Sequence, residues 1–302
     1  KEKEDIEAAS KLAKELGIPY HVFNCVNEYE TVVLENFKKE YLSGRTPNPC
    51  VWCNALIKFG VLPQLAKANG VDFDKFATGH YARVEKEGER FVLKRGIAPK
   101  KDQSYFLYRL KQEQLANIML PLGGYTKEEI RDIARSHGME VAEKPDSQDF
   151  YGGDYNELLG VKELEGNIVD VSGKVLGTHK GFWNYTIGQR KGLGVSASEP
   201  LYVLELRKGT NEVVVGFADK TFKKSLIAVD TNWIAIDGLK EEMQVTVKIR
   251  STQQPVPAII RPIADGVEVV FEDLQKSIAI GQSAVFYDGD RVLGGGVIDR
   301  VN

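Results

Sequence analysis

Apolar residues in the first half of the chain follow helical and strand-like spacing in turn. From Ile6 to Leu16 they recur every three or four positions, which predicts an amphipathic helix that ends at Gly17. Similar patterns predict further helices at 31–41, 56–69 and 126–137. Strands are expected at 19–23, within 73–83 and at 91–95. This alternation predicts an α/β domain built on a largely parallel sheet.

The hydrophobic pattern changes near residue 167, beyond which short strands and turns predominate. Residues 168–177 predict a hairpin with Ser172 and Gly173 at its turn. Alternating segments predict strands at 201–206, 212–216, 245–250, 258–261, 267–271 and 283–287. Such short, evenly spaced strands are typical of an antiparallel barrel. We therefore expect an α/β domain at 1–155, a small β-rich domain at 156–217 and a C-terminal antiparallel β-barrel at 218–302.

Composition places the chain among ordinary globular proteins. Of its 302 residues, 42% are hydrophobic and 27% charged, and the net charge of −3 excludes a globally basic nucleic-acid binder. Any RNA-binding surface would be a local patch. Three cysteines in a long chain argue against a secreted disulfide scaffold. No apolar run approaches the ~20 residues that span a bilayer, so we expect a cytoplasmic protein without a membrane partner.

Two of the cysteines, Cys50 and Cys53, form a Cys-x-x-Cys motif where a stiff loop leads into a helix. Pro47 and Pro49 restrict the loop, and Asn54 is expected to cap the helix that follows. The N-terminus of a helix favours thiolate, which is the reactive form of cysteine. The motif therefore favours thiol chemistry.

Three interpretations of this motif remain open from the residues alone. The thiols could carry out sulfur or redox chemistry, supply half the ligands of a metal or iron–sulfur site, or be two small buried residues. A zinc ribbon is disfavoured because there is no second Cys-x-x-Cys and the four histidines are scattered: His21, His80, His137 and His179. Cys25 follows the expected strand at 19–23 and could face an active cleft or be a buried hydrophobic residue.

The stretch around the motif resembles the tRNA-specific 2-thiouridylase family. Residues 44–49 (Gly-Arg-Thr-Pro-Asn-Pro), Cys53-Asn54 and 57–59 (Ile-Lys-Phe) carry this resemblance. Further matches to the family's motifs follow in the family's order at 77–81, 101–107, 185–194 and 281–282. The resemblance covers essentially the whole chain. It implies an adenine nucleotide alpha hydrolase-like domain followed by small β-rich and barrel domains that grip tRNA.

The resemblance also implies a mechanism. ATP, assisted by Mg²⁺, would adenylate the wobble uridine (U34) at O2, and sulfur borne by a cysteine would then replace AMP at C2. Cys53 matches the cysteine nearest the base, with Cys50 as its partner, and Gly79 matches the glycine that lies on ATP. The family's Ser-Gly-Gly-x-Asp-Ser phosphate loop is absent from the sequence. We therefore expect an N-terminally incomplete chain with an incomplete ATP site.

The implied partners are the anticodon region of tRNA and an upstream sulfur-carrier protein or sulfide donor. The resemblance places tRNA contacts at Asn48, Pro49, Cys50, His80, Lys101, Asp102, Gln103, Arg190, Lys191, Arg250, Ser251 and Gln282. Without it, His80 would be taken for a structural histidine, and 100–103 and 190–191 for solvated turns. At Ser251 the family usually has an aromatic residue.

Tyr151 marks the main departure from the family, because many relatives have there the cysteine that carries the persulfide. Either Cys50 and Cys53 relay the sulfur between them, or they hold an iron–sulfur cluster completed by Asp149, Cys25 or an external ligand. Two other classes stay open, a non-catalytic tRNA-binding relative and a different α/β ligase or sulfurtransferase. The tRNA-type motifs argue against the last of these.

Overall fold

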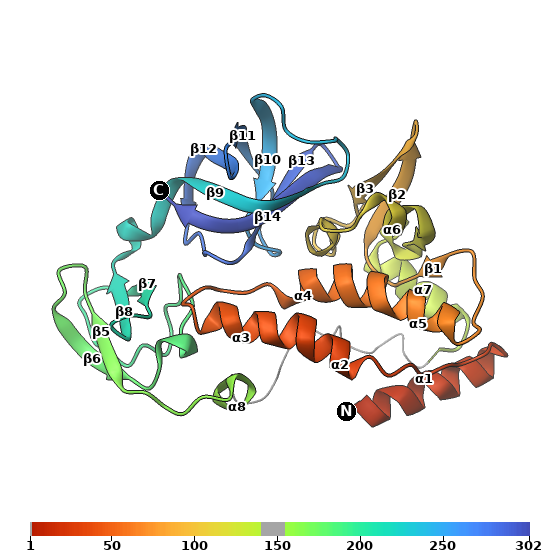
Figure 1. Ribbon diagram of the computed structural model, residues 1–302, viewed down its shortest axis with the longest axis horizontal. Coiled ribbons are helices and arrows are strands. Elements are labelled where there is room, and N and C mark those ends of the chain that lie inside the picture. The colour runs from red at the N-terminus through yellow and green to blue at the C-terminus, as the bar shows by residue number, and fades with distance from the viewer. Residues whose placement is uncertain (1, 140–154) are drawn as a thin grey trace.

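The computed structural model describes residues 2–139 and 155–302 (Figure 1). Its N-terminal part is mainly helical. The isolated helix α1 (Glu2–Leu16) ends at Gly17, whose φ of +66° is the left-handed conformation expected at a helix C-terminus. Two longer helices follow, each interrupted by a π-helical segment. The first comprises α2 (Val26–Tyr29), η1 (Glu30–Leu34) and α3 (Glu35–Tyr41), and the second α4 (Pro49–Trp52), η2 (Cys53–Val61) and α5 (Leu62–Ala68).

The predicted buried strand at 19–23 is wrong. The segment pairs with no other strand among the described residues, and Val22 is 59% exposed. The cause is the lack of a partner, because an extended segment becomes a strand only when a neighbour takes up its N–H and C=O groups. Its apolar residues therefore face solvent beside α1, where the Tyr20 hydroxyl donates to the Ile6 carbonyl.

The α/β character predicted for this domain is confirmed, and its parallel sheet is short. Strand β1 (Phe76–Ala77) pairs in parallel with β4 (Ile118–Met119). Short helices surround this pair: η3 (Ser104–Leu107), α6 (Gln112–Asn117), η4 (Pro121–Gly124) and α7 (Lys127–Ser136). The predicted capping box opens α7, since Thr126 Oγ1 accepts from Glu129 N and Glu129 Oε2 accepts from Thr126 N.

An antiparallel hairpin connects the helical domain to the barrel. Strands β2 (Ala82–Glu87) and β3 (Arg90–Arg95) pair with each other, and Lys94 of β3 pairs with Arg291 on the barrel. A shared apolar core runs across this junction, from Val51 and Tyr105 to Val285 and Tyr287. The barrel is therefore packed against the domain that carries the cysteines.

The small β-rich domain and the C-terminal barrel are both present as predicted. After α8 (Tyr155–Leu159), a four-stranded sheet has the order β6-β5-β8-β7: β5 (Gly166–Val169), β6 (Val175–His179), β7 (Tyr202–Arg207) and β8 (Glu212–Gly216), with η6 (Phe182–Asn184) between β6 and β7. Phe37 of α3 enters its core.

Six antiparallel strands close the barrel through the pairing of β13 with β14. After η7 (Ala218–Thr221) they are β9 (Phe222–Trp233), β10 (Met243–Lys248), β11 (Val256–Ile263), β12 (Gly266–Lys276), β13 (Ser283–Asp288) and β14 (Arg291–Val301). Glycine at 295 lets the barrel approach the helical domain, since a Cβ there would lie 2.7 Å from the Tyr108 ring. Figure 1 shows the barrel beside the loop that precedes α4.

Candidate active site

Cys50 and Cys53 lie in the first turns of a helix that begins earlier than predicted. Asn48 is the residue before α4, Pro49 is its first residue, and Cys53 opens the π-helical segment η2. Proline suits the first position of a helix because that position needs no N–H donor. The two thiols, three residues apart, therefore share one helix face, and π-helical segments often occur at functional sites.

The predicted cap at Asn54 is wrong. Asn54 lies inside the helix and is buried, and its Nδ2 donates to the Phe106 carbonyl at 3.3 Å. Its Oδ1 is buried without a hydrogen-bond partner. Its amide thus ties the cysteine helix to η3 instead of closing a helix end.

Three other side chains share the electrostatic environment of the thiols. Tyr29 on α2 lies close enough to Cys53 and Cys50 that burial, followed by their negative charge, raises the pKa of its phenol to about 12. Cys25, the residue before α2, also lies close to Cys53, and its negative charge raises the pKa of the Cys53 thiol. Lys58 of η2 supplies the positive charge. All three cysteines carry free thiols, so the chain gathers its nucleophilic sulfur in one region.

The helix start does not produce the lowered thiol pKa that the sequence favoured. Burial raises the pKa of both Cys50 and Cys53, and the Lys58 ammonium opposes that rise. The mutual repulsion of the two thiolates adds to the rise at Cys53. Cys50 is nevertheless exposed at the surface, whereas Cys53 is half-buried. Cys50 is accordingly the thiol that an external donor can reach.

His80 and the two thiols share a positively charged neighbour, because the Lys58 ammonium acts on all three. Burial, followed by the charge of Lys58, lowers the pKa of His80 to about 4. Its Nδ1 is 2.8 Å from Thr78 Oγ1, and its ring lies 5.6 Å from that of Phe59. His80 is therefore a neutral hydrogen-bonding group at pH 7.

Gly79 follows β1 at the carboxyl end of the parallel pair, where open α/β sheets bind ligands. A Cβ there would meet only Leu122 Cδ1, at an ordinary contact distance of 3.5 Å. The fold does not itself demand glycine at this position. A glycine here still lets another group come closer to the backbone than a larger residue would, which is compatible with the close approach of a nucleotide.

A metal site is not formed by the described part of the chain. Among residues 2–139 and 155–302, no group of three His, Cys, Asp or Glu side chains could hold a metal ion. Tyr151 and Asp149, which the sequence singled out, lie outside these ranges. No helix in the same ranges has the length and apolar character needed to cross a membrane.

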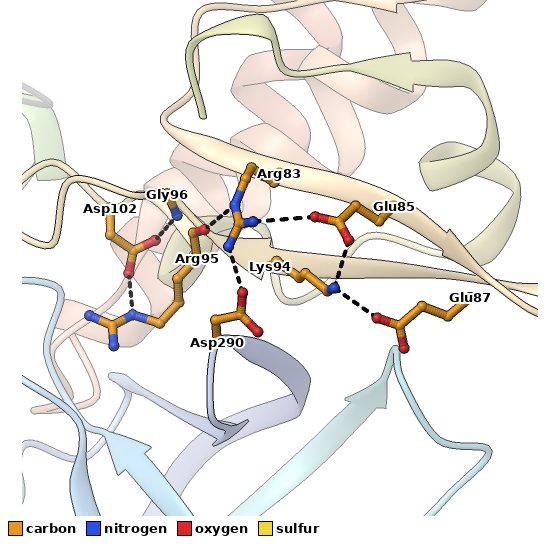
Figure 2. Close-up of polar contacts among 8 residues, drawn as sticks. All are labelled: Arg83, Glu85, Glu87, Lys94, Arg95, Gly96, Asp102 and Asp290. Atoms are coloured by element: carbon orange, nitrogen blue, oxygen red, sulfur yellow. Dashed lines mark hydrogen bonds and ion pairs between the residues drawn. The ribbon is translucent and has the colours of Figure 1, made fainter. Parts of the chain in front are cut away.

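Asp102 is buried in an ionic network, away from the solvent-facing surface. Its side chain has no exposed area and accepts from Arg95 Nε at 3.3 Å, with Lys248 Nζ at 3.6 Å. Figure 2 shows the contact between Asp102 and Arg95. Beside it, the guanidinium of Arg83 donates to Asp290 on the barrel. Lys94 lies between Glu85 and Glu87 in the same view. The network joins β2, β3 and the barrel.

The neighbours of Asp102 differ in exposure. Lys101 and Gln103 are half-buried, and Gln103 Oε1 accepts from Tyr81 N at 2.9 Å. Gln103 thereby links the 101–107 motif to the residue after His80. In this arrangement Asp102 holds the junction together, and Lys101 and Gln103 flank it at half-buried positions.

The remaining expected contacts lie near the junction of the small domain and the barrel. Arg190 and Lys191 are exposed in one loop of the small domain. Arg250 is half-buried and donates to the carbonyls of Ile187 at 3.1 Å and Ser277 at 2.7 Å, which ties the two domains together. Ser251 follows it and is half-buried.

The structure thus brings Asn48, Pro49, Cys50, Cys53 and His80 into one region. Arg190 and Lys191 lie in a loop of the small domain. Two residues of the region around the cysteines escaped the sequence reasoning. Tyr29 lies one helical turn after Cys25, with its N–H donating to the Cys25 carbonyl at 2.9 Å, and that spacing is the signal that could have revealed it. Lys58 entered the sequence reasoning only as part of the Ile-Lys-Phe match at 57–59, and its effect on the thiols was not foreseen.

Comparison with known proteins gives one consistent result. Family models match the chain in order: the tRNA methyl transferase HUP domain at 1–151, the tRNA methyl transferase PRC-barrel domain at 156–217 and the Aminomethyltransferase beta-barrel domain at 223–298. The tRNA-specific 2-thiouridylase MnmA of Endomicrobium trichonymphae is 50% identical over 98% of this chain and 84% of its own length. Those of Geotalea uraniireducens and Clostridium botulinum are 48% and 45% identical over 98% of this chain, and over 81% and 84% of their own lengths.

Proposed function

The chain belongs to the tRNA-specific 2-thiouridylase family, a family of sulfurtransferases, and from this premise we propose that it 2-thiolates the wobble uridine of tRNA in an ATP-dependent reaction. The observation that carries the proposal is the pair of free thiols, Cys50 and Cys53, on one face at the start of a helix. Sulfur transfer needs a carrier and a second thiol within reach, and this pair supplies both.

The first step is activation of the base. Attack of the uridine O2 on the α-phosphate of ATP releases pyrophosphate and leaves AMP as a leaving group at C2. The place of Gly79 just after β1, at the carboxyl end of the parallel pair, supports a nucleotide position there. No metal ligand set is found in the described residues, so we derive no step through Mg²⁺. The uridine must leave the anticodon stack to reach a site of this kind.

The second step moves sulfur between the two cysteines and the base. Cys50 is exposed, which suits it to accept a sulfane sulfur from a donor as a Cys50 persulfide. The terminal sulfur of this persulfide attacks C2, and AMP leaves. The Cys53 thiolate then attacks the Cys50 sulfur, which gives a Cys50–Cys53 disulfide and releases the thiolated base. Alternatively, Cys53 attacks the persulfide first, which forms the same disulfide and releases sulfide as the nucleophile. In either route an external thiol must reduce the disulfide to two thiols before the next turnover.

The neighbouring residues suit these steps. Lys58 lowers the pKa of both thiols against the effect of burial, so it increases the thiolate fraction at neutral pH. His80 is neutral and can donate or accept a hydrogen bond beside the base without repelling Lys58. We prefer the two-cysteine relay to an iron–sulfur cluster because the two free thiols on one helix face supply all that the relay needs.

For tRNA we propose contacts around the cysteine helix and along the small domain. Asn48, Pro49, Cys50, His80, Lys101 and Gln103 border the cysteine helix or the β1 loop. Arg190 and Lys191 offer two exposed cations to phosphate. Arg250 and Ser251 lie where the small domain meets the barrel. We propose that they contact tRNA there, next to the small-domain loop whose Ile187 carbonyl accepts from Arg250.

Mass spectrometry of nucleosides tests this proposal. Full-length protein, unmodified tRNA, ATP, Mg²⁺ and a persulfide donor are incubated, and the tRNA is digested. We expect 2-thiouridine that depends on ATP. Methylated uridine would instead support the methyl transfer in the descriptions of two family models. tRNA binding with neither product, and without ATP–pyrophosphate exchange, would show a non-catalytic binder.

A further inference from the structure

The loop that leads to Cys50 is held by one turn of the barrel. Gln282 Nε2 donates to the carbonyl of Thr46 at 3.2 Å and to that of Pro47 at 2.9 Å. Pro47 and Pro49 carry no N–H, so this stretch cannot be fixed by a regular backbone ladder. The glutamine amide therefore supplies order that the loop cannot supply itself.

The backbone around Gln282 is shaped for the same contact. Gly281 has a φ of +92°, and a Cβ there would lie 2.9 Å from the Thr46 oxygen and 3.0 Å from its nitrogen. The Thr46 N–H donates to the Ile280 carbonyl at 2.8 Å, and the Ile298 N–H donates to that of Gln282 at 2.8 Å. The turn is thus anchored to β14 on one side and to the loop on the other.

The loop is also held one residue before the helix. Asn48 is buried, and its Nδ2 lies 3.5 Å from Ser283 Oγ instead of its oxygen capping the helix. The Tyr105 hydroxyl donates to the Ser283 carbonyl at 3.0 Å and lies 3.5 Å from Gln282 Oε1. Both N–H bonds of the Gln282 amide are therefore directed at the loop in this structure.

We propose that Gln282 is a positioning residue for the Cys50–Cys53 pair. It fixes the carbonyls of Thr46 and Pro47, and the helix begins two residues after Pro47, so a shift of the loop displaces Cys50. This inference rests on the proposed sulfur transfer and assigns Gln282 to the thiols, whereas the family resemblance suggested an RNA contact. Misplacement of a reacting group by ~1 Å can cost ~100-fold in rate.

The test compares Gln282→Glu and Gln282→Ala with Gln244→Glu in the full-length protein. Glutamate has nearly the volume of glutamine but cannot donate to the two carbonyls, and Gln244 is exposed elsewhere on the barrel. We expect kcat for 2-thiouridine to fall ~10- to 100-fold in both Gln282 variants, with KM for tRNA unchanged. Without tRNA or ATP, amide exchange at 45–52 and alkylation of Cys53 should become faster. Gln244→Glu should change none of these.

Two results would overturn the inference. Unchanged exchange and alkylation in both Gln282 variants would show that the amide does not hold the loop. A raised KM for tRNA with unchanged kcat would make Gln282 an RNA contact. Wild-type protein that makes no 2-thiouridine would contradict the proposed function, while faster exchange and alkylation in the variants would still support the clamp.

Discussion

The guanidinium of Arg109 lies over the ring of Trp52, 4.2 Å from the ring centroid. Trp52 stands between the two cysteines, and Arg109 also pairs with Asp230 on β9, with Nη2 2.7 Å from Oδ2. The cysteine helix therefore has a second connection to the barrel, through a stacked cation. Stacking of this kind depends on the planar shape of arginine.

Arg109→Lys should weaken this connection while keeping the charge. We expect a loss of about 1 kcal/mol in the free energy of unfolding, because the ammonium cannot reproduce the stacked, forked geometry. Urea unfolding followed by fluorescence measures it. Arg261→Lys is the control, since Arg261 pairs with Glu242 and Glu268 on the exposed barrel surface. Equal losses in the two variants would contradict the role of stacking.

Lys58→Met should raise the pKa of three groups together. The ammonium lowers the pKa of Cys50, Cys53 and His80, so its removal raises all three. Alkylation of the thiols at fixed pH should slow, and its pH profile should move to higher pH, whereas Lys58→Arg should resemble wild type. Lys67→Met, further along the same helix, is the matched control. The idea fails if Lys67→Met and Lys58→Met give the same profile.

Because His80 has a lowered pKa, we expect the free energy of unfolding to fall in acid. Its pKa is about 4 when folded, against an ordinary value of 6.5, so the unfolded chain binds the extra proton between these values. Stability from this group is present above pH 6.5 and is lost as pH falls toward 4, by up to about 3 kcal/mol. Carboxylates titrate in the same range, so the quantity to measure is the difference between wild type and His80→Gln. Identical slopes between pH 6.5 and 4 would contradict the assignment.

Asp102→Asn should destabilise the junction strongly. Lys248 would keep its charge with only 3% of its side chain exposed and would lose its anionic partner. Removing one partner of a buried pair costs about 3–5 kcal/mol. The added change Lys248→Met should recover part of this loss, because it removes the unpaired charge. Asp237→Asn, at an 84% exposed position, should cost less than about 1 kcal/mol.

Periodicity predicted the barrel and the small β-rich domain well, because alternation and turn residues are local signals. The hairpin at 168–177 and the strand at 91–95 formed as expected. The helix after the motif was also foreseen, but not its start. Asparagine commonly caps helices, but the side-chain amide of Asn54 donates to the Phe106 carbonyl. The helix begins earlier, at Pro49.

Contacts between distant segments could not be read from spacing. Gln282 and Thr46 are 236 positions apart, and nothing local shows that one holds the other. Likewise, nothing in the sequence around Asp102 shows that its carboxylate lies beside Lys248, 146 positions away, at the junction. At the thiols, the helix start argued for a lowered pKa, but desolvation depends on how the surrounding helices pack.

The most direct test of the account is the yield of 2-thiouridine per tRNA for three full-length proteins: wild type, Cys50→Ala and Cys53→Ala. Each is supplied with tRNA, ATP, Mg²⁺ and a persulfide donor, and the nucleosides are quantified by mass spectrometry. The two-cysteine relay predicts product from wild type and at least ~100-fold less from either variant. Wild-type yield from Cys50→Ala or Cys53→Ala would contradict the relay, because the remaining thiol would then suffice alone.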